Sequence, residues 1–143
     1  MRAVPPISIL LVEDNPADVR LTVEALREAR VENTLHVARD GVEATEFLQS
    51  TGTAARRPDL ILLDLNLPRK NGHELLMEIK ASEALKHIPV IVLTTSRSDD
   101  DLVRSYRLCA NAVVAKPVGL DDFFHVVNLI EQFWLGTAML SRP

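Results

Sequence analysis

The chain has 143 residues, 47% hydrophobic and 25% charged, which is the composition of one ordinary globular domain. Twenty acidic and 16 basic side chains give a formal net charge of -4, which disfavours a nucleic-acid-binding role. The one cysteine, Cys109, cannot form an internal disulfide, and we expect it to be a small buried side chain in a cytoplasmic protein. Because no apolar run approaches the ~18 residues of a membrane span and no signal-peptide core is present, no membrane partner is expected.

Short apolar runs alternate with amphipathic stretches five times, which is typical of a parallel sheet with helices on both faces. The predicted strands are residues 7–12, 35–38, 60–65, 90–94 and 112–115. Three of these runs are almost continuously apolar, as strands covered on both sides must be. The predicted fold class is therefore α/β, in a single domain.

Capping signals and apolar stripes indicate where the helices lie. Asn15 followed by a proline starts the first helix, which runs to about residue 29. Asp40 and Ser98, each three residues before an acidic residue, start the second and fourth helices. Apolar stripes place the third helix around residues 75–79 and the fifth at residues 120–135.

The predicted elements divide the chain into three parts. Residues 1–6 form an N-terminal extension, residues 7–135 form the domain, and residues 136–143 form a C-terminal tail. The polar stretch 51–57 is predicted to be a loop whose two arginines, Arg56 and Arg57, face water.

Functional side chains lie at the carboxyl ends of four of the five predicted strands: Glu13 and Asp14 at the first, Asp64 at the third, Thr94 at the fourth and Lys116 at the fifth. Ligands of a doubly wound sheet bind at the carboxyl ends of its strands, so we expect these groups to share one site. Neighbouring carboxylates repel one another unless a cation neutralises them, and hard oxygen ligands suit Mg²⁺. The lysine and the threonine hydroxyl would then bind the oxygens of a phosphoryl group.

Each group also has an ordinary explanation. Glu13 and Asp14 can be solvated turn acids, Thr94 can be a plain strand residue, and Lys116 can be a loop lysine. Their joint occurrence at the correct ends of four strands favours a functional site. The four histidines show no ligand spacing, and none is assigned a role.

Four segments together resemble the receiver domains of two-component response regulators. They are ILLVEDNP, LILLDLNLPRKNG, VIVLTTS and VVAKP, and the resemblance covers the chain from about Ile7 to Trp134. It implies a flavodoxin-like fold with five parallel strands in the order 2-1-3-4-5 and five flanking helices. It further implies that Asp64 accepts a phosphoryl group from the phosphohistidine of a sensor histidine kinase.

The same resemblance implies roles for the neighbouring residues. Glu13, Asp14 and Asp64 would bind Mg²⁺ together with the backbone carbonyl of Asn66. Lys116 and Thr94 would hold the phosphoryl oxygens, and the Lys116–Pro117 bond would be cis, which an X-Pro bond permits.

The chain departs from the family at Val113, where receiver domains usually carry an aromatic residue that couples phosphorylation to the output face. Valine has no ring whose change of rotamer could couple phosphorylation to the output face. The sequence therefore favours output through changed self-association. Tyr106, on the fourth helix, belongs either to the core or to the output face.

The fifth helix has an apolar sector too wide for one core contact, because Leu129 and Phe133 extend the stripe that ends at Trp134. We expect a homodimer interface at Leu129, Phe133 and Trp134; the alternative is that residues 136–143 fold back and cover the stripe. The segment FWLGTAML also resembles the end of a subfamily of dimeric single-domain regulators paired with phytochrome-type kinases. The resemblance therefore implies a bacteriophytochrome as the partner kinase.

Two other functions compete with a phosphoacceptor. A Mg²⁺-dependent phosphatase acting through an aspartyl phosphate would carry an acid two residues after Asp64, where this chain has Asn66. The other competing function is a receiver fold that serves only as a binding module, and the intact acidic cluster argues against it.

Overall fold

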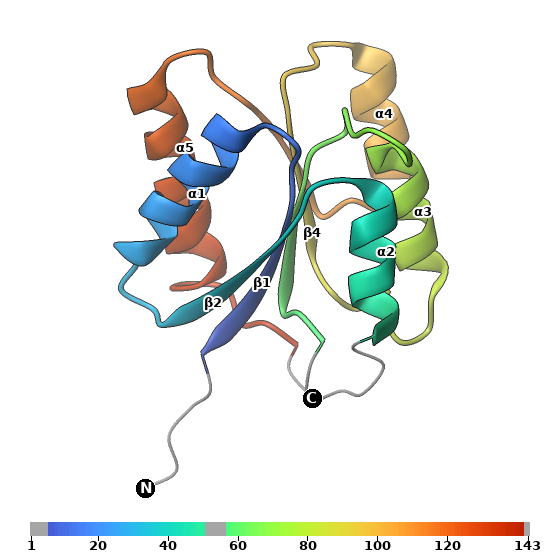
Figure 1. Cartoon of the computed structure of the whole chain (residues 1–143), viewed down its shortest axis with the longest axis horizontal. Coiled ribbons are helices and arrows are strands. Elements are labelled where there is room, and N and C mark those ends of the chain that lie inside the picture. The colour runs from blue at the N-terminus through green and yellow to red at the C-terminus, as the bar shows by residue number, and fades with distance from the viewer. Residues whose placement is uncertain (1–5, 51–56, 142–143) are drawn as a thin grey trace, which may run out of the picture.

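The computed structural model describes residues 6–50 and 57–141 and contains one five-stranded parallel sheet (Figure 1). Its strands are β1 (Ile7–Val12), β2 (Asn33–Ala38), β3 (Leu60–Leu63), β4 (Val90–Thr94) and β5 (Ala112–Ala115), in the order β2-β1-β3-β4-β5. The predicted α/β class and strand order are confirmed. Strand β2 begins at Asn33 rather than at residue 35, and β3 ends at Leu63 rather than at residue 65.

Five helices connect and cover the strands. They are α1 (Pro16–Arg27), α2 (Gly41–Ser50), α3 (Gly72–Ala81), α4 (Asp99–Arg107) and α5 (Leu120–Trp134). Helices α1 and α5 lie on one face of the sheet, and α2, α3 and α4 lie on the other (Figure 1). The sheet is therefore the middle of three layers, as the alternating sequence pattern predicts.

The predicted helix starts are confirmed by their capping contacts. The Asn15 side chain accepts hydrogen bonds from the backbone N–H groups of the first turn of α1. Asp40 accepts one from the Glu43 N–H at 2.8 Å, and Ser98 accepts one from the Asp101 N–H at 3.3 Å. Because these caps satisfy otherwise unpaired donors, they fix where each helix leaves its loop.

Alternate residues of β1 point into two separate cores. Leu10 and Val12 pack with side chains of α2 and α3, while Ile9 and Leu11 pack with side chains of α1 and α5. All residues of β3 and β4 are buried. Successive side chains of a strand point to opposite faces, so a shift of one residue would move each buried side chain into the other core. This burial therefore fixes the register of the strands and with it the positions of the ends of β1 and β3.

Two surface predictions are wrong. Cys109 is exposed, because it follows Leu108, the C-cap of α4, in a left-handed conformation (φ 70°) and the next residue, Ala110, takes the buried position. Arg57 is half-buried, because its guanidinium donates to the carbonyls of Ala84 (3.1 Å) and Ser141 (3.2 Å). Arg56 and most of the predicted 51–57 loop lie outside the described residues, as do residues 1–5 of the extension and 142–143 of the tail.

The described part of the tail leaves the outer side of α5 uncovered. Leu129 is 51% exposed and Phe133 is 53% exposed, although the tail is described as far as Ser141. Trp134 is half-buried, packs against the α1/α5 core and meets the Phe133 ring edge-on, with the ring centroids 5.3 Å apart. The fold-back alternative thus does not account for the wide apolar sector among the residues described.

Candidate functional site

The carboxyl ends of β1, β3 and β5 hold the predicted site residues in place through backbone hydrogen bonds. The Glu13 N–H donates to the Ala38 carbonyl at 2.9 Å, and the Asp64 N–H donates to the Val12 carbonyl at 3.0 Å. Strand β1 leads into a helix on one face and β3 into a helix on the other, so this edge is the topological switch point of the sheet. Ligands of doubly wound folds bind at such a point.

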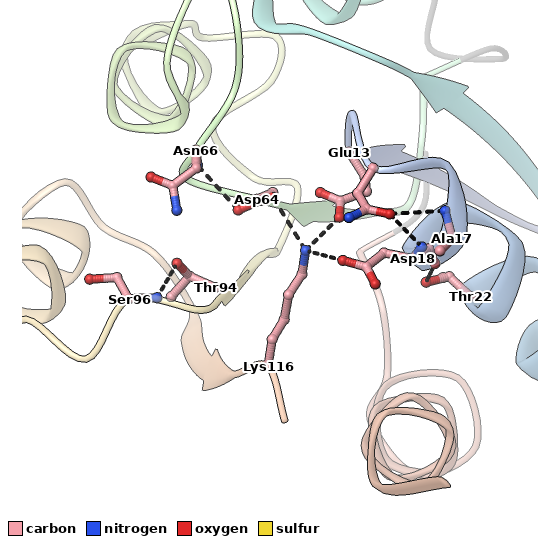
Figure 2. Close-up of polar contacts among 10 residues, drawn as sticks. Glu13, Ala17, Asp18, Thr22, Asp64, Asn66, Thr94, Ser96 and Lys116 are labelled. Atoms are coloured by element: carbon pink, nitrogen blue, oxygen red, sulfur yellow. Dashed lines mark hydrogen bonds and ion pairs between the residues drawn. The ribbon is translucent and has the colours of Figure 1, made fainter. Parts of the chain in front are cut away.

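One buried ammonium group lies at the centre of the site (Figure 2). Lys116, 5% exposed, donates from its Nζ to Glu13 Oε1, to Asp18 Oδ2 at 2.9 Å and to Asp64 Oδ2 at 3.2 Å. Its own backbone N–H donates to the Thr94 carbonyl at 2.7 Å, which fixes where the lysine leaves β5. The structure thus joins the ends of three strands through one lysine.

An acidic cluster adjoins the ammonium. One carboxylate oxygen from each of Glu13, Asp14 and Asp64 lies within 4.8 Å of the others. Glu13 and Asp64 are buried and Asp14 is exposed, so the cluster is open on one side. Hard oxygen donors at this spacing fit a divalent cation that keeps several water ligands.

Burial and neighbouring charge change the protonation of Glu13. Burial, a hydrogen bond to Asp64 and the Asp64 charge raise the pKa of Glu13 to about 9, against the lowering effect of Lys116. Glu13 Oε2 is buried and has no hydrogen-bond partner. A carboxyl group in this condition is a ready ligand for a cation, because a bound cation offsets both the burial and the neighbouring Asp64 charge that keep it protonated.

Lys116 remains charged in these surroundings. Burial alone would lower the pKa of its ammonium group, but the hydrogen bonds to Glu13 and Asp18, and the charge on Glu13 and Asp64, raise it above the usual range. A permanent positive charge is therefore present where an anionic group bound at Asp64 would lie.

The side chains of two predicted site residues do not contact the Lys116 ammonium. The Thr94 hydroxyl accepts a hydrogen bond from the Ser96 N–H at 3.1 Å (Figure 2). Asn66, which is exposed, contacts Asp64 through its backbone N–H, which donates to Asp64 Oδ1 at 3.1 Å. Both therefore adjoin the site, and neither contacts the ammonium.

The implied cis bond between Lys116 and Pro117 is wrong, since no peptide bond among the described residues is cis. The trans form of an X-Pro bond is intrinsically favoured by roughly 0.5–1 kcal/mol, so a cis bond requires surroundings that select it. The residue types alone do not show whether the surroundings of Pro117 favour the cis isomer.

Asp18 is a site residue that sequence reasoning missed. It lies in the first turn of α1, four residues after Asp14, and reaches Lys116 from the helix side. The signal was present, because Asn15 and Pro16 fix the start of the helix and side chains in a first turn lean back toward that start.

The surface around Val113 contains a further contact. Val113 is half-buried, and its N–H donates to the hydroxyl of Tyr106, which projects from α4 and is 50% exposed. Tyr106 thus lies on the surface of α4 rather than in the core. An aromatic side chain does contact β5, but it comes from the neighbouring helix.

A buried histidine links α3 to α4. His73 Nε2 lies 3.1 Å from Ser105 Oγ, and that hydroxyl donates its proton to the Asp101 carbonyl at 2.8 Å. Burial and the charge of Arg104 lower the pKa of His73, against a raising effect of Asp101. Because the hydroxyl has one proton, the neutral ring is the donor to Ser105.

The stability of the chain is therefore expected to fall on acidification below about pH 6.5 in a way that depends on His73. Below pH 6.5 His73 binds a proton in the unfolded state, whereas in the folded state its lowered pKa keeps it neutral. The stability that is present above pH 6.5 is therefore lost as the pH falls from 6.5 toward the lower folded-state pKa of His73. Urea midpoints at pH 7.5 and 5.5 should differ more in the wild type than in His73→Gln. Equal differences in the two proteins would contradict this expectation.

Residues 9–128 match the family described as response regulator receiver domain, and the chain belongs to that family. It is 50% identical to response regulator Rcp1 of Synechocystis sp. over 138 residues, which cover 95% of this chain and 94% of Rcp1. It is 42% identical over 144 residues to a probable methanogenesis regulatory protein, FilR2 of Methanothrix harundinacea, covering 100% of this chain and 93% of that protein.

Two solved structures resemble the whole fold. The Mn²⁺-bound form of Rcp1 has a TM-score of 0.90 and 49% sequence identity, covering 95% of this chain and 99% of its own. The phosphorylated cyanobacterial phytochrome response regulator RcpA has a TM-score of 0.89 and 49% identity, with the same coverage. The predicted receiver family and flavodoxin-like fold are confirmed. Within residues 6–50 and 57–141, no helix combines the length and apolarity that a membrane crossing needs.

Proposed function

We propose that the chain is a phosphoacceptor signalling protein in which Asp64 takes a phosphoryl group from the phosphohistidine of a sensor histidine kinase. The observation that carries this proposal is the buried Asp64 carboxylate, which lies 3.2 Å from the Lys116 ammonium and within the acidic cluster. A nucleophile, a cation for the transferred group and oxygen ligands for a metal are the parts that phosphoryl transfer needs.

In the proposed transfer, an Asp64 oxygen forms a bond to phosphorus while the phosphorus–nitrogen bond of the phosphohistidine breaks. The electron pair stays on the imidazole nitrogen, which then binds a proton. Lys116 and Thr94 would hold phosphoryl oxygens, and the Thr94 hydroxyl, which accepts from the Ser96 N–H, keeps its own proton to donate. Glu13, Asp14, Asp64 and the Asn66 carbonyl would bind Mg²⁺, which supplies charge neutralisation when present.

Incubation with acetyl phosphate tests the proposal directly. Intact mass measured with and without Mg²⁺ should reveal one added phosphoryl group only when Mg²⁺ is present. Steady turnover of a phosphomonoester would instead favour the phosphatase, and failure to take phosphate from any small donor would favour the binding module.

The proposed partner is a phytochrome-type histidine kinase, and the proposed location is the cytoplasm. The part of the chain that would receive the phosphoryl group is the receiver domain, residues 7–135. Support comes from the resemblance to RcpA, described as a phytochrome response regulator, and from the 94% of Rcp1 that the chain covers. Phosphoryl transfer from an autophosphorylated phytochrome kinase, compared with a kinase of another input class, tests this partner.

The proposed output is protein contact through a homodimer formed by Leu129, Phe133 and Trp134, with residues 136–143 contributing. Leu129 and Phe133 are each about half exposed, whereas soluble monomers seldom expose neighbouring large apolar side chains without a partner.

Phe133→Asp is expected to convert the dimer to a monomer, because a charge buried in an apolar interface without a partner is costly. Sedimentation equilibrium measures the mass. Met77→Asp, at a residue of α3 that is also 53% exposed, is the control and should leave the mass unchanged. An unchanged mass for Phe133→Asp would contradict the proposed interface.

A further inference from the structure

Lys116 has one partner that stands outside the acidic cluster. Asp18 Oδ2 accepts from the Lys116 Nζ at 2.9 Å, while the cluster itself consists of Glu13, Asp14 and Asp64. The Asp18 side chain is 24% exposed, against 3% for Glu13 and 10% for Asp64. Asp18 therefore approaches the lysine from the rim of the site.

The backbone of Asp18 is firmly held. Its N–H donates to the Asn15 side chain at 3.2 Å, and its carbonyl accepts from the Thr22 hydroxyl at 2.7 Å. Thr22 is itself buried, so the first turn of α1 is fixed on the sheet. From this fixed turn the carboxylate points at the ammonium (Figure 2).

The ammonium of a lysine has three N–H donors, and here each meets a different carboxylate. In the proposed function, which this inference deepens and on which it rests, Glu13 and Asp64 serve as metal ligands. Of the three partners of the lysine, Asp18 is then the one with no other group to bind.

We propose that Asp18 is the positioning residue of Lys116. It keeps one N–H of the ammonium engaged while Glu13 and Asp64 bind the metal, so that the other two N–H groups face the phosphoryl oxygens on Asp64. Asp18 touches neither phosphorus nor metal in this role, and it acts only through the lysine.

Phosphorylation by acetyl phosphate at saturating Mg²⁺ tests this role. Asp18→Asn, which keeps the size and removes the charge, should be phosphorylated about tenfold more slowly than the wild type, because a displaced catalytic group costs one to two orders of magnitude. Glu24→Gln removes the same charge from the same helix and should react at the wild-type rate, since Glu24 pairs with Arg20 on the surface.

A double-mutant cycle shows whether the effect passes through the lysine. In a Lys116→Met background, Asp18→Asn should cause no further slowing. An unchanged or faster rate for Asp18→Asn alone, or the same slowing in the Lys116→Met background, would overturn the proposal.

A second readout does not depend on phosphorylation. The shifts in urea midpoint caused by Asp18→Asn and Lys116→Met, measured in Mg²⁺, should be non-additive, and additive shifts would overturn the role of Asp18. If the wild type takes up no phosphoryl group while the shifts remain non-additive, the proposed function fails but Asp18 still holds the lysine beside the metal site.

Discussion

Asp64→Asn is expected to abolish the Mg²⁺-dependent phosphoryl gain from acetyl phosphate. The amide has nearly the shape of the carboxylate, but it is a poor nucleophile and a weaker ligand for a hard cation. The substitution also removes the carboxylate oxygen that accepts from Lys116 Nζ at 3.2 Å. Intact mass after prolonged incubation measures the result, which should be no added group.

The matched control for this substitution is Asp59→Asn. Asp59 is also a buried carboxylate, 5% exposed. It immediately precedes β3, at the opposite end of this strand from Asp64, and it accepts a hydrogen bond from the Ser8 N–H at 2.9 Å. Asp59→Asn should still gain one phosphoryl group. A gain in Asp64→Asn equal to that of the wild type would place the acceptor on another residue.

Gly72→Ala is expected to lower stability and slow phosphorylation together. A Cβ at Gly72 would lie 2.5 Å from the Asp64 carbonyl oxygen and 2.5 Å from Leu65 Cα. Since both are backbone atoms, the segment that carries the phosphoacceptor must shift. Overpacking of this kind costs about 1–3 kcal/mol, against which the helix preference for alanine recovers less than about 1 kcal/mol.

Gly119→Ala provides the comparison, because a Cβ there has its nearest neighbour, Asp122 Oδ2, at 3.7 Å. Gly119 is the N-cap of α5 and Gly72 is the first residue of α3, so both substitutions change a glycine at the start of a helix. Urea midpoints and rates of phosphorylation should be close to the wild type for Gly119→Ala and reduced for Gly72→Ala. Equal values for both variants would show that the contact with Asp64 places no constraint on the site.

The strand ends made most of the site predictable. Glu13, Asp64 and Lys116 meet because parallel strands place their carboxyl ends along one edge, whatever the loops do. That rule predicts which side chains lie close together, but it does not predict which atoms form hydrogen bonds. It therefore could not show that the Thr94 hydroxyl bonds to Ser96, away from the lysine.

Contacts that depend on local backbone geometry were the ones missed. Asp18 reaches the site only because the first turn of α1 is capped in one orientation. The trans bond before Pro117 reflects a small energy difference between isomers, which the residue types do not settle. The exposure of Cys109 follows from a positive φ at the end of α4, at a residue other than glycine.

The exposed position of Cys109 makes the chain ready for site-directed spectroscopy. It is the one cysteine in the sequence, so a maleimide dye or nitroxide attaches at a single place without any substitution. Its N–H donates to the Tyr106 carbonyl at 2.9 Å, and the Tyr106 hydroxyl in turn contacts β5. A label there would therefore follow the end of α4 against the sheet, and in a dimer it would give one distance between two identical probes.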